Sequence, residues 1–299
     1  MHRRTLLAAA ASLAAGITAR PAAGVAMRRH MTVSPPKMDG APGSSPMIRI
    51  GAMPGIGASI NGRGPYTFGI DTGADGFVHL SSQLAQALAL PVIGEAMASD
   101  PSGKNPIHIR RFKISALQLA GVTFKDLDAE GMPPLPGAAK LLDGILGMDL
   151  FDALTLSLDF KKGEVGLSSL PAPAADGRSV FAYEPGPTIR LPVTIGAATY
   201  EADLDTGNMG SPLLFPTEWI ARLPTHGAPQ KRGIAHSISQ TVQMYAVPLD
   251  APARVGAVLL PASEVAYPNV APVANIGSKA LQGMVVRIDR ANRRVQFET

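Results

Sequence analysis

Residues 65–75 read PYTFGIDTGAD, a run of alternating apolar side chains that ends at an aspartate. Tyr66, Phe68 and Ile70 have the period-two spacing of a strand with one buried face, and Asp71 follows directly. A carboxylate that closes a buried strand is costly unless a partner stabilises it. The stretch therefore predicts a strand that carries a functional acid, whose partner lies elsewhere in the chain.

A second copy of the same pattern supplies a candidate partner. Residues 200–208 read YEADLDTGN and place Asp205 134 positions after Asp71. Further on, residues 145–167 match residues 275–297 at an offset of 130, with apolar positions and glycines in register. Repetition of this kind predicts two copies of one fold unit of roughly 125 residues.

Each copy has the pattern of a β structure. The chain contains 31 glycines and 27 prolines without a short period, which favours many turns between short strands. A hairpin is expected at residues 57–71 with its turn at Asn61 and Gly62, and another at residues 193–205 with its turn near Gly196. Short helices are expected within residues 79–88 and 216–223, with Pro216 in a first helical turn. Flap hairpins are expected with tips near Gly103 and Gly233. A closing strand pair is expected in each copy. We therefore expect an all-β, two-lobed fold.

The N-terminal residues have the pattern of an export signal. Residues 1–26 contain paired Arg3 and Arg4, an alanine-rich apolar segment and small residues up to Ala26, as in twin-arginine signals. No later run of about 18 apolar residues predicts a membrane span. We expect a periplasmic or secreted protein without an integral membrane segment. The expected organisation is a signal at 1–26, a flexible lead-in at 27–45, a first lobe at 46–172, a linker at 173–187 and a second lobe at 188–299.

Composition and motif spacing exclude several classes of site. The chain has no cysteine, so it offers no disulfide, thiol nucleophile or thiolate metal ligand. Its six histidines lack metal-ligand spacing, and no phosphate-binding or serine-hydrolase motif is present. We expect no metal and no cofactor. Of the net charge of +4, three arginines lie in residues 1–26, so nucleic acid is not an expected partner.

Two ionisable residues follow the first triplet closely. His79 is predicted to be a hydrogen-bonded or solvated side chain near a helix start. Asp75 is matched by Met209 in the second copy, which argues against a paired role. It is predicted to be a helix-start or surface acid.

Two carboxylates that face each other across a pseudo-two-fold axis form an acid-base pair. At close range they share one proton and titrate in two coupled steps. One can then take a proton from water while the other donates a proton to a carbonyl oxygen, so hydrolysis needs neither a metal nor a covalent intermediate. Glycine after each Asp-Thr allows backbone amides to approach the carboxylates.

These triplets resemble the active-site loops of aspartic proteases. The DTGA sequence at residues 71–74 and the downstream ILG at residues 145–147 are most similar to the bacterial retropepsin-like aspartyl proteases. The resemblance covers residues 46–299 in two copies and implies a closed, mainly β lobe per copy with a peptide or protein substrate between the lobes. It further implies a catalytic pair and residues that brace the loops or orient the carboxylates: Asp71 and Asp205 as the pair, then Thr72, Gly73, Ala74, Thr206, Gly207 and Asn208.

The second copy departs from the family pattern at two positions. Asn208 stands where the family has Ala, Ser or Thr, and Asn275 stands where the first copy has Ile145. A changed hydrogen bond beside Asp205 would alter its share of the proton. The leading interpretation is an aspartic endopeptidase that acts as a monomer. The alternatives are a periplasmic peptide-binding protein with a degenerate second site, and a protease that requires a dimer.

Overall fold

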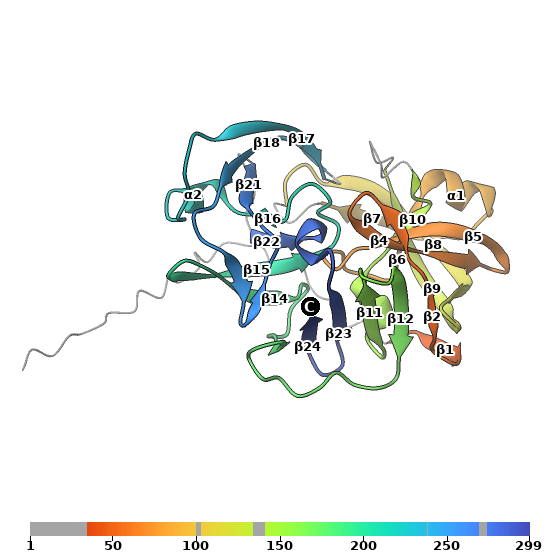
Figure 1. Ribbon diagram of the computed structural model, residues 1–299. Helices are drawn as coiled ribbons and strands as arrows, with labels where there is room; N and C mark the ends of the chain where they lie inside the picture. The colour runs from red at the N-terminus through yellow and green to blue at the C-terminus, as the bar shows by residue number, and fades with distance from the viewer. Residues whose placement is uncertain (1–34, 100–102, 134–140, 238, 269–273) are drawn as a thin grey trace, which may run out of the picture. The chain divides into compact units, whose positions relative to one another are not determined.

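Strands dominate the computed structural model, which describes residues 35–99, 103–133, 141–237, 239–268 and 274–299 (Figure 1). The predicted all-β class is confirmed. The described residues belong to one compact unit. The predicted signal at residues 1–26 lies outside them. Among the described helices, none is long and apolar enough to cross a membrane.

The first loop is carried by a sheet with nine strands among the described residues. Its hairpin of β4 and β5 turns at Asn61 and Gly62 as predicted, because both residues adopt the positive φ angles (50° and 77°) that a tight hairpin turn needs. Phe68 and Ile70 are fully buried as predicted, whereas Tyr66 is half-buried and Gly69, between the two, is buried as well. The strands, in sheet order, are β1 (Lys37–Gly40), β9 (Val122–Met132), β6 (Val78–Ser81), β10 (Gly144–Leu146), β5 (Arg63–Ile70), β4 (Met53–Ile60), β8 (Ile107–Leu119) and β7 (Val92–Ala98), with β3 (Ile48–Ile50) paired to β4.

The second loop is carried by another sheet that also has nine strands among the described residues. Its hairpin turns at Gly196 as predicted. The pairings around the two loops correspond: β5 runs parallel to β10, as β15 does to β22, while β6 and β16 run antiparallel to β10 and β22. The strands, in sheet order, are β17 (Gln230–His236), β18 (Thr241–Pro248), β21 (Glu264–Pro268), β16 (Leu213–Leu214), β22 (Ala274–Gly277), β15 (Ala198–Asp205), β14 (Arg190–Ile195), β19 (Ala253–Val255) and β20 (Val258–Leu259).

The closing strand pairs of the two halves meet in a third sheet, with six strands among the described residues. Figure 1 shows the dark-blue β23 and β24 beside the green β11 and β12, and β11 pairs with β23 over residues 155–159 and 285–289. The closing strand pairs of both halves therefore belong to one shared sheet. The strands, in sheet order, are β13 (Val180–Ala182), β24 (Arg294–Glu298), β23 (Val285–Asp289), β11 (Thr155–Asp159), β12 (Glu164–Ser168) and β2 (Ser44–Pro46).

Two predicted connecting segments contain strands. In the lead-in predicted as flexible at 27–45, residues 37–40 pair with β9 and residues 44–46 pair with β12, so that prediction is wrong there. Residues 27–34 lie outside the described residues. The predicted linker at 173–187 contains β13, because Val180 and Phe181 are buried against the sheet. Proline and glycine there interrupt the strand pattern without excluding a short strand.

Short helices follow both loops, with boundaries that differ slightly from the predicted ones. Helix α1 spans Ser82–Ala87 and is capped by Ser81, whose Oγ accepts a hydrogen bond from Leu84 N. Helix α2 spans Thr217–Ile220, with Pro216 as its N-cap residue rather than in its first turn. The 3₁₀ helices η2 (Met148–Phe151) and η3 (Ser278–Leu281) follow β10 and β22.

One of the predicted flap tips is misplaced. Gly233 lies inside β17 at a register shift, with a φ angle of 106°, and the hairpin turns between Ser237 and Gln240 instead. The glycine serves a β-bulge, which has the same sequence signature as a turn. Gly103 does lie in the connection between β7 and β8, of which residues 100–102 are outside the described residues.

Candidate active site

The first loop begins where β5 leaves its parallel partner β10. Asp71 N donates to the carbonyl of Leu146 at 3.1 Å, and Ala74 N closes a turn by donating to the Asp71 carbonyl at 3.2 Å. The loop packs directly on Gly147, where a Cβ atom would lie 2.4 Å from the carbonyl oxygen of Asp75. The ILG motif therefore supplies two pairing positions and a glycine that lets the loop approach the backbone.

The second loop is held by equivalent backbone bonds. Asn208 N donates to the Asp205 carbonyl at 3.2 Å, as Ala74 N does to Asp71. Gly277 matches Gly147 in its close packing, since a Cβ there would lie 2.2 Å from the carbonyl oxygen of Ser211. The NIG sequence of the second half therefore supports its loop as ILG supports the first, through strand pairing and a closely packed glycine.

Two buried threonines join the loops through reciprocal hydrogen bonds. Thr72 N donates to Thr206 Oγ1 and Thr206 N donates to Thr72 Oγ1, each at 2.9 Å. The hydroxyls in turn donate across the loops, from Thr72 to the Leu204 carbonyl at 2.7 Å and from Thr206 to the Ile70 carbonyl at 2.6 Å. Thr72 and Thr206 are 1% and 0% exposed, so these four bonds are shielded from water.

The two carboxyl groups lie together at the centre of this arrangement. Asp71 and Asp205 share a side-chain hydrogen bond. Gly73 N donates to Asp71 Oδ1 at 2.8 Å, and the Gly207 amide donates to both carboxyl groups. The glycines make this possible: a Cβ on Gly73 would lie 2.9 Å from Asp205 Oδ1, and one on Gly207 would lie 2.4 Å from Asp71 Oδ2.

Burial and mutual repulsion keep a proton on the pair. Burial raises the pKa of both Asp71 and Asp205, and the mutual repulsion of the two carboxylates adds to the shift. Backbone N–H donors oppose the shift but do not cancel it. The arrangement therefore favours one proton shared by two carboxylates over a range of pH that extends above the ordinary value for aspartate.

The two asparagines that depart from the family pattern bond to each other and to Asp205. Asn208 Nδ2 donates to Asn275 Oδ1 at 2.7 Å, and Asn275 Nδ2 donates to Asp205 Oδ2 at 2.9 Å. Asn208 N also donates to Asp205 Oδ1 at 3.0 Å. Asn275 was visible in the sequence only as an irregularity, and the structure adds it to the residues that contact the pair.

The ionisable residues after the first triplet lie beside the pair rather than in it. His79 is in β6, and its Nε2 bonds to the Asp75 carbonyl at 2.8 Å, which agrees with a hydrogen-bonded histidine. Its Nδ1 lies 3.7 Å from Glu130 Oε2. Of the two roles predicted for Asp75, helix-start or surface acid, the first is wrong because β6 separates the residue from α1, and the residue is half-buried.

An ion pair that the sequence did not predict links the third sheet to the first loop. Arg290, at the end of β23, donates from NH2 to Asp149 Oδ1 at 3.0 Å and from Nε to Asp152 at 2.6 Å. Asp149 Oδ2 accepts from Gly76 N at 2.8 Å. The guanidinium and both carboxylates are at most 30% exposed, so this contact is partly shielded from solvent. It fixes the backbone five residues after Asp71.

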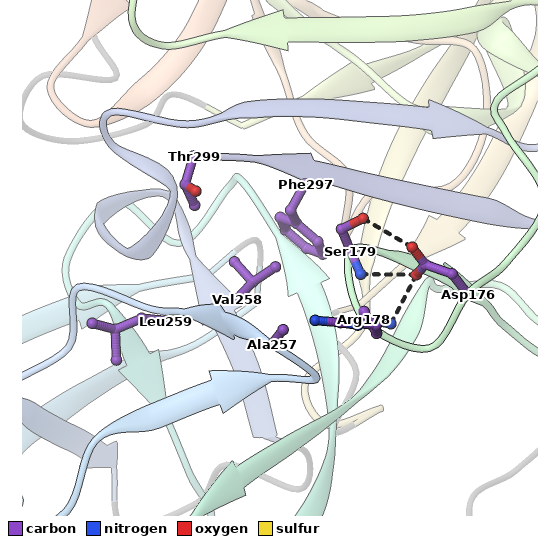
Figure 2. A pocket seen from close by; sticks show the side chains of 8 residues that line it. All are labelled: Asp176, Arg178, Ser179, Ala257, Val258, Leu259, Phe297 and Thr299. Carbon is purple, nitrogen blue, oxygen red and sulfur yellow. Dashed lines mark hydrogen bonds between the residues drawn. The ribbon is translucent and has the colours of Figure 1, made fainter.

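Figure 2 shows a pocket away from the aspartate pair, near the end of the chain. Its one carboxylate, Asp176, accepts hydrogen bonds from the backbone N–H groups of Val180, Arg178 and Ser179, each at 2.8 Å. These bonds lower the pKa of Asp176. The carboxylate therefore closes a turn, and none of the other described residues that line the pocket has an acidic side chain.

All eight residues predicted for the site come together in the structure. The first loop contributes Asp71, Thr72, Gly73 and Ala74, and the second contributes Asp205, Thr206, Gly207 and Asn208. The described residues hold no group of three or more acids or histidines placed to bind a metal ion.

Comparisons with known proteins agree with this geometry for part of the chain. A search of curated proteins found no match. Residues 56–150, which contain the first loop, match the family model described as aspartyl protease. The matched segment ends before Asp205, so the match concerns the first half only. It supports placing that half in the aspartyl protease family.

Proposed function

We propose that the protein is an exported aspartic endopeptidase that hydrolyses peptide bonds with a water activated between Asp71 and Asp205. The observation that carries the proposal is the hydrogen-bonded carboxyl pair on two loops joined by Thr72 and Thr206. The aspartyl protease match supports a hydrolase of this class. Export rests on the sequence of residues 1–26.

The reaction requires one proton on the pair. The ionised carboxylate takes a proton from water as the water oxygen attacks the peptide carbonyl carbon, and the protonated carboxyl donates to the carbonyl oxygen. As the tetrahedral intermediate collapses, the C–N bond breaks, the proton taken from water passes to the amine nitrogen, and the proton on the former carbonyl oxygen returns to the other carboxylate. Because one chain supplies both carboxyls and both threonines, the geometry favours action by a single chain over a dimer.

Hydrolysis of an unstructured peptide library by the full chain tests the proposal. Cleavage between pH 3 and 8 should follow a bell-shaped profile, rising as the pair loses its first proton and falling as it loses its second. Since burial raises the pKa of both carboxyls, the maximum should lie above 3.8, the ordinary value for aspartate. Hydrolysis in H₂¹⁸O should place one ¹⁸O in each new carboxyl terminus. Peptide binding without cleavage at any pH would favour the binding-protein alternative.

Gly207→Ala should lower kcat/KM by about 10²-fold, the size of effect expected when a reacting group moves by about 1 Å. The new Cβ would lie 2.4 Å from Asp71 Oδ2 and 2.6 Å from its Cγ, so the carboxyl group has to move. Gly166→Ala is the matched control, because its Cβ would meet Ser157 Cβ at 3.5 Å and Ser44 Cβ at 4.0 Å, which are ordinary contact distances. Equal peptide-cleavage rates for the two variants would show that this close approach is unimportant.

A further inference from the structure

Each carboxylate of the pair lies beside a strand of its own sheet, β10 for Asp71 and β22 for Asp205, and the side chains at the matching positions of these strands differ. Asp205 Oδ2 accepts a hydrogen bond from the side-chain amide of Asn275 at 2.9 Å. The matching position beside the first loop is Ile145, which pairs with β5 as Asn275 pairs with β15. Isoleucine has no polar side-chain atom, so the two halves of the site are chemically unequal at this position.

The orientation of the Asn275 amide is determined by backbone groups. Asn208 Oδ1 accepts from the backbone N–H groups of Gly210 at 3.1 Å and Ser211 at 3.2 Å. Backbone N–H groups only donate, so the Asn208 amide cannot be reversed, and its Nδ2 faces Asn275 Oδ1 at 2.7 Å. The Asn275 Nδ2 group must then be the one that faces Asp205.

An amide nitrogen donates hydrogen bonds and does not accept them, and this constrains the protonation state of Asp205. Its Oδ2 must act as an acceptor towards Asn275, and its Oδ1 already accepts from Asn208 N at 3.0 Å. Donors to both oxygens favour the ionised form of a carboxyl group. Gly73 N donates to Asp71 Oδ1 as Asn208 N does to Asp205 Oδ1, so these backbone donors match and the Asn275 amide is the additional donor. When the pair holds one proton, this additional donor places the proton on Asp71.

Three charged groups lie on the Asp205 side of the pair. Asp203, two residues earlier on β15, opposes ionisation of Asp205, but Arg190 Nε lies 3.0 Å from Asp203 Oδ1 and offsets its charge. Lys279 on η3 donates from Nζ to the carbonyl of Gly210 at 2.9 Å.

On the opposite side, the relevant ionisable neighbours are His79 and Glu130. A positive charge on His79 favours ionised Asp71. Glu130 Oε2 lies 3.7 Å from His79 Nδ1 and offsets that charge. Asn275 makes a direct hydrogen bond of 2.9 Å to Asp205, and its side chain is nine-tenths shielded from water. His79 acts on Asp71 only through its charge, which Glu130 offsets, so the direct hydrogen bond outweighs it.

We propose that Asn275 is a positioning residue that holds Asp205 as the ionised member of the pair and leaves the shared proton on Asp71. This rests on the proposed function and adds the direction of proton transfer to it. Asp205 takes the proton from water as the water oxygen bonds to the carbonyl carbon. The proton on Asp71 passes to the carbonyl oxygen.

Asn275→Leu tests the proposal because leucine keeps the branched shape of asparagine and removes the donor. The acidic limb of the profile of kcat/KM against pH should move up by about one pH unit, since an ionised Asp205 loses its hydrogen bond. The basic limb should stay in place. Asn292→Leu is the matched control, because Asn292 Nδ2 also donates to a carboxylate, that of Asp289 at 2.9 Å, but away from the site.

Carbon-13 NMR titration of the aspartate carboxyls gives a second readout that does not depend on cleavage. In the parent chain Asp205 should ionise before Asp71, and in Asn275→Leu this order should weaken or reverse. Asn275→Ala replaces the leucine variant if leucine prevents folding. Movement of the basic limb instead, unchanged profiles in a folded variant, or earlier ionisation of Asp71 in the parent would overturn the proposal. A parent chain that cleaves no peptide but titrates as expected would refute only the proposed function.

Discussion

Asp71→Asn and Asp205→Asn should each lower kcat/KM for peptide hydrolysis by about 10⁴-fold, because an amide can neither take a proton from water nor hold the shared proton. The pair acts as a unit, so the double variant should be no less active than either single one. The measurement is the initial rate of cleavage of one peptide at the optimum pH. If Asp71→Asn alone is inactive, Asp205 has no part in the reaction and the dimer alternative gains support.

The same substitutions should stabilise the fold at neutral pH. Burial raises the pKa of both carboxyls above 3.8, so from that pH upwards the native chain binds more protons than the unfolded chain. The contribution of the pair to the free energy of unfolding is therefore fully present below pH 3.8 and is lost as the pH rises through the raised pKa values. Asparagine at either position removes the carboxylate repulsion that keeps the extra proton on the native chain, and with it this loss of stability. Thermal denaturation at pH 7 should show a higher Tm for both variants.

Asp126→Asn is the control for both measurements. Asp126 is exposed and has a φ angle of 56°, which asparagine adopts readily. Its substitution should leave both the cleavage rate and the Tm at pH 7 unchanged. Lower Tm values for the Asp71 and Asp205 variants would contradict the repulsion argument, even if activity were lost.

Thr206→Val should destabilise the fold by about 2–4 kcal/mol, one of the larger effects expected from a substitution of equal size. Valine removes the donor to the Ile70 carbonyl and the acceptor of the Thr72 N–H group. Both backbone groups are then left buried without a partner, and each such group costs about 1–3 kcal/mol. Denaturation by urea, monitored by circular dichroism, measures the loss.

Two further variants separate the hydroxyl from the shape of the side chain. Thr206→Ser keeps the hydroxyl and should retain most of the stability. Thr199→Val removes an exposed hydroxyl that bonds to Thr194 at 3.0 Å on a hairpin, and should change the free energy of unfolding by less than about 0.5 kcal/mol. Equal losses for Thr206→Val and Thr199→Val would mean that the cross-loop bonds contribute little.

Local patterns predicted the strands that carry the site. The alternation of Phe68 and Ile70 and the turn residues Asn61 and Gly62 are short-range signals, and the structure agrees with them. Repetition of the triplet at an offset of 134 predicted that Asp71 and Asp205 would meet. The misplaced flap tip at Gly233 arose because a glycine with positive φ serves a bulge as well as a turn.

Short-range sequence signals did not predict which distant segments would pair. Strands β1 and β2 lie in a stretch rich in proline, glycine and serine, and they form because β9 and β12 offer free edges. The pairing of β11 with β23 joins segments 130 positions apart. Sequence patterns show that a strand has one buried face, but they do not show which strand will pair with its edge.

The sequence by itself determined the two carboxylates, the threonines and glycines beside them, and the all-β elements that present them, because these depend on residue type and short-range period. Only the tertiary structure decided what Asn208 and Asn275 do. They looked like faults in a repeat, yet they lie 67 residues apart in the chain and 2.7 Å apart in space. The side-chain amide of one can reach Asp205 only because parallel pairing of β15 and β22 brings the two strands together.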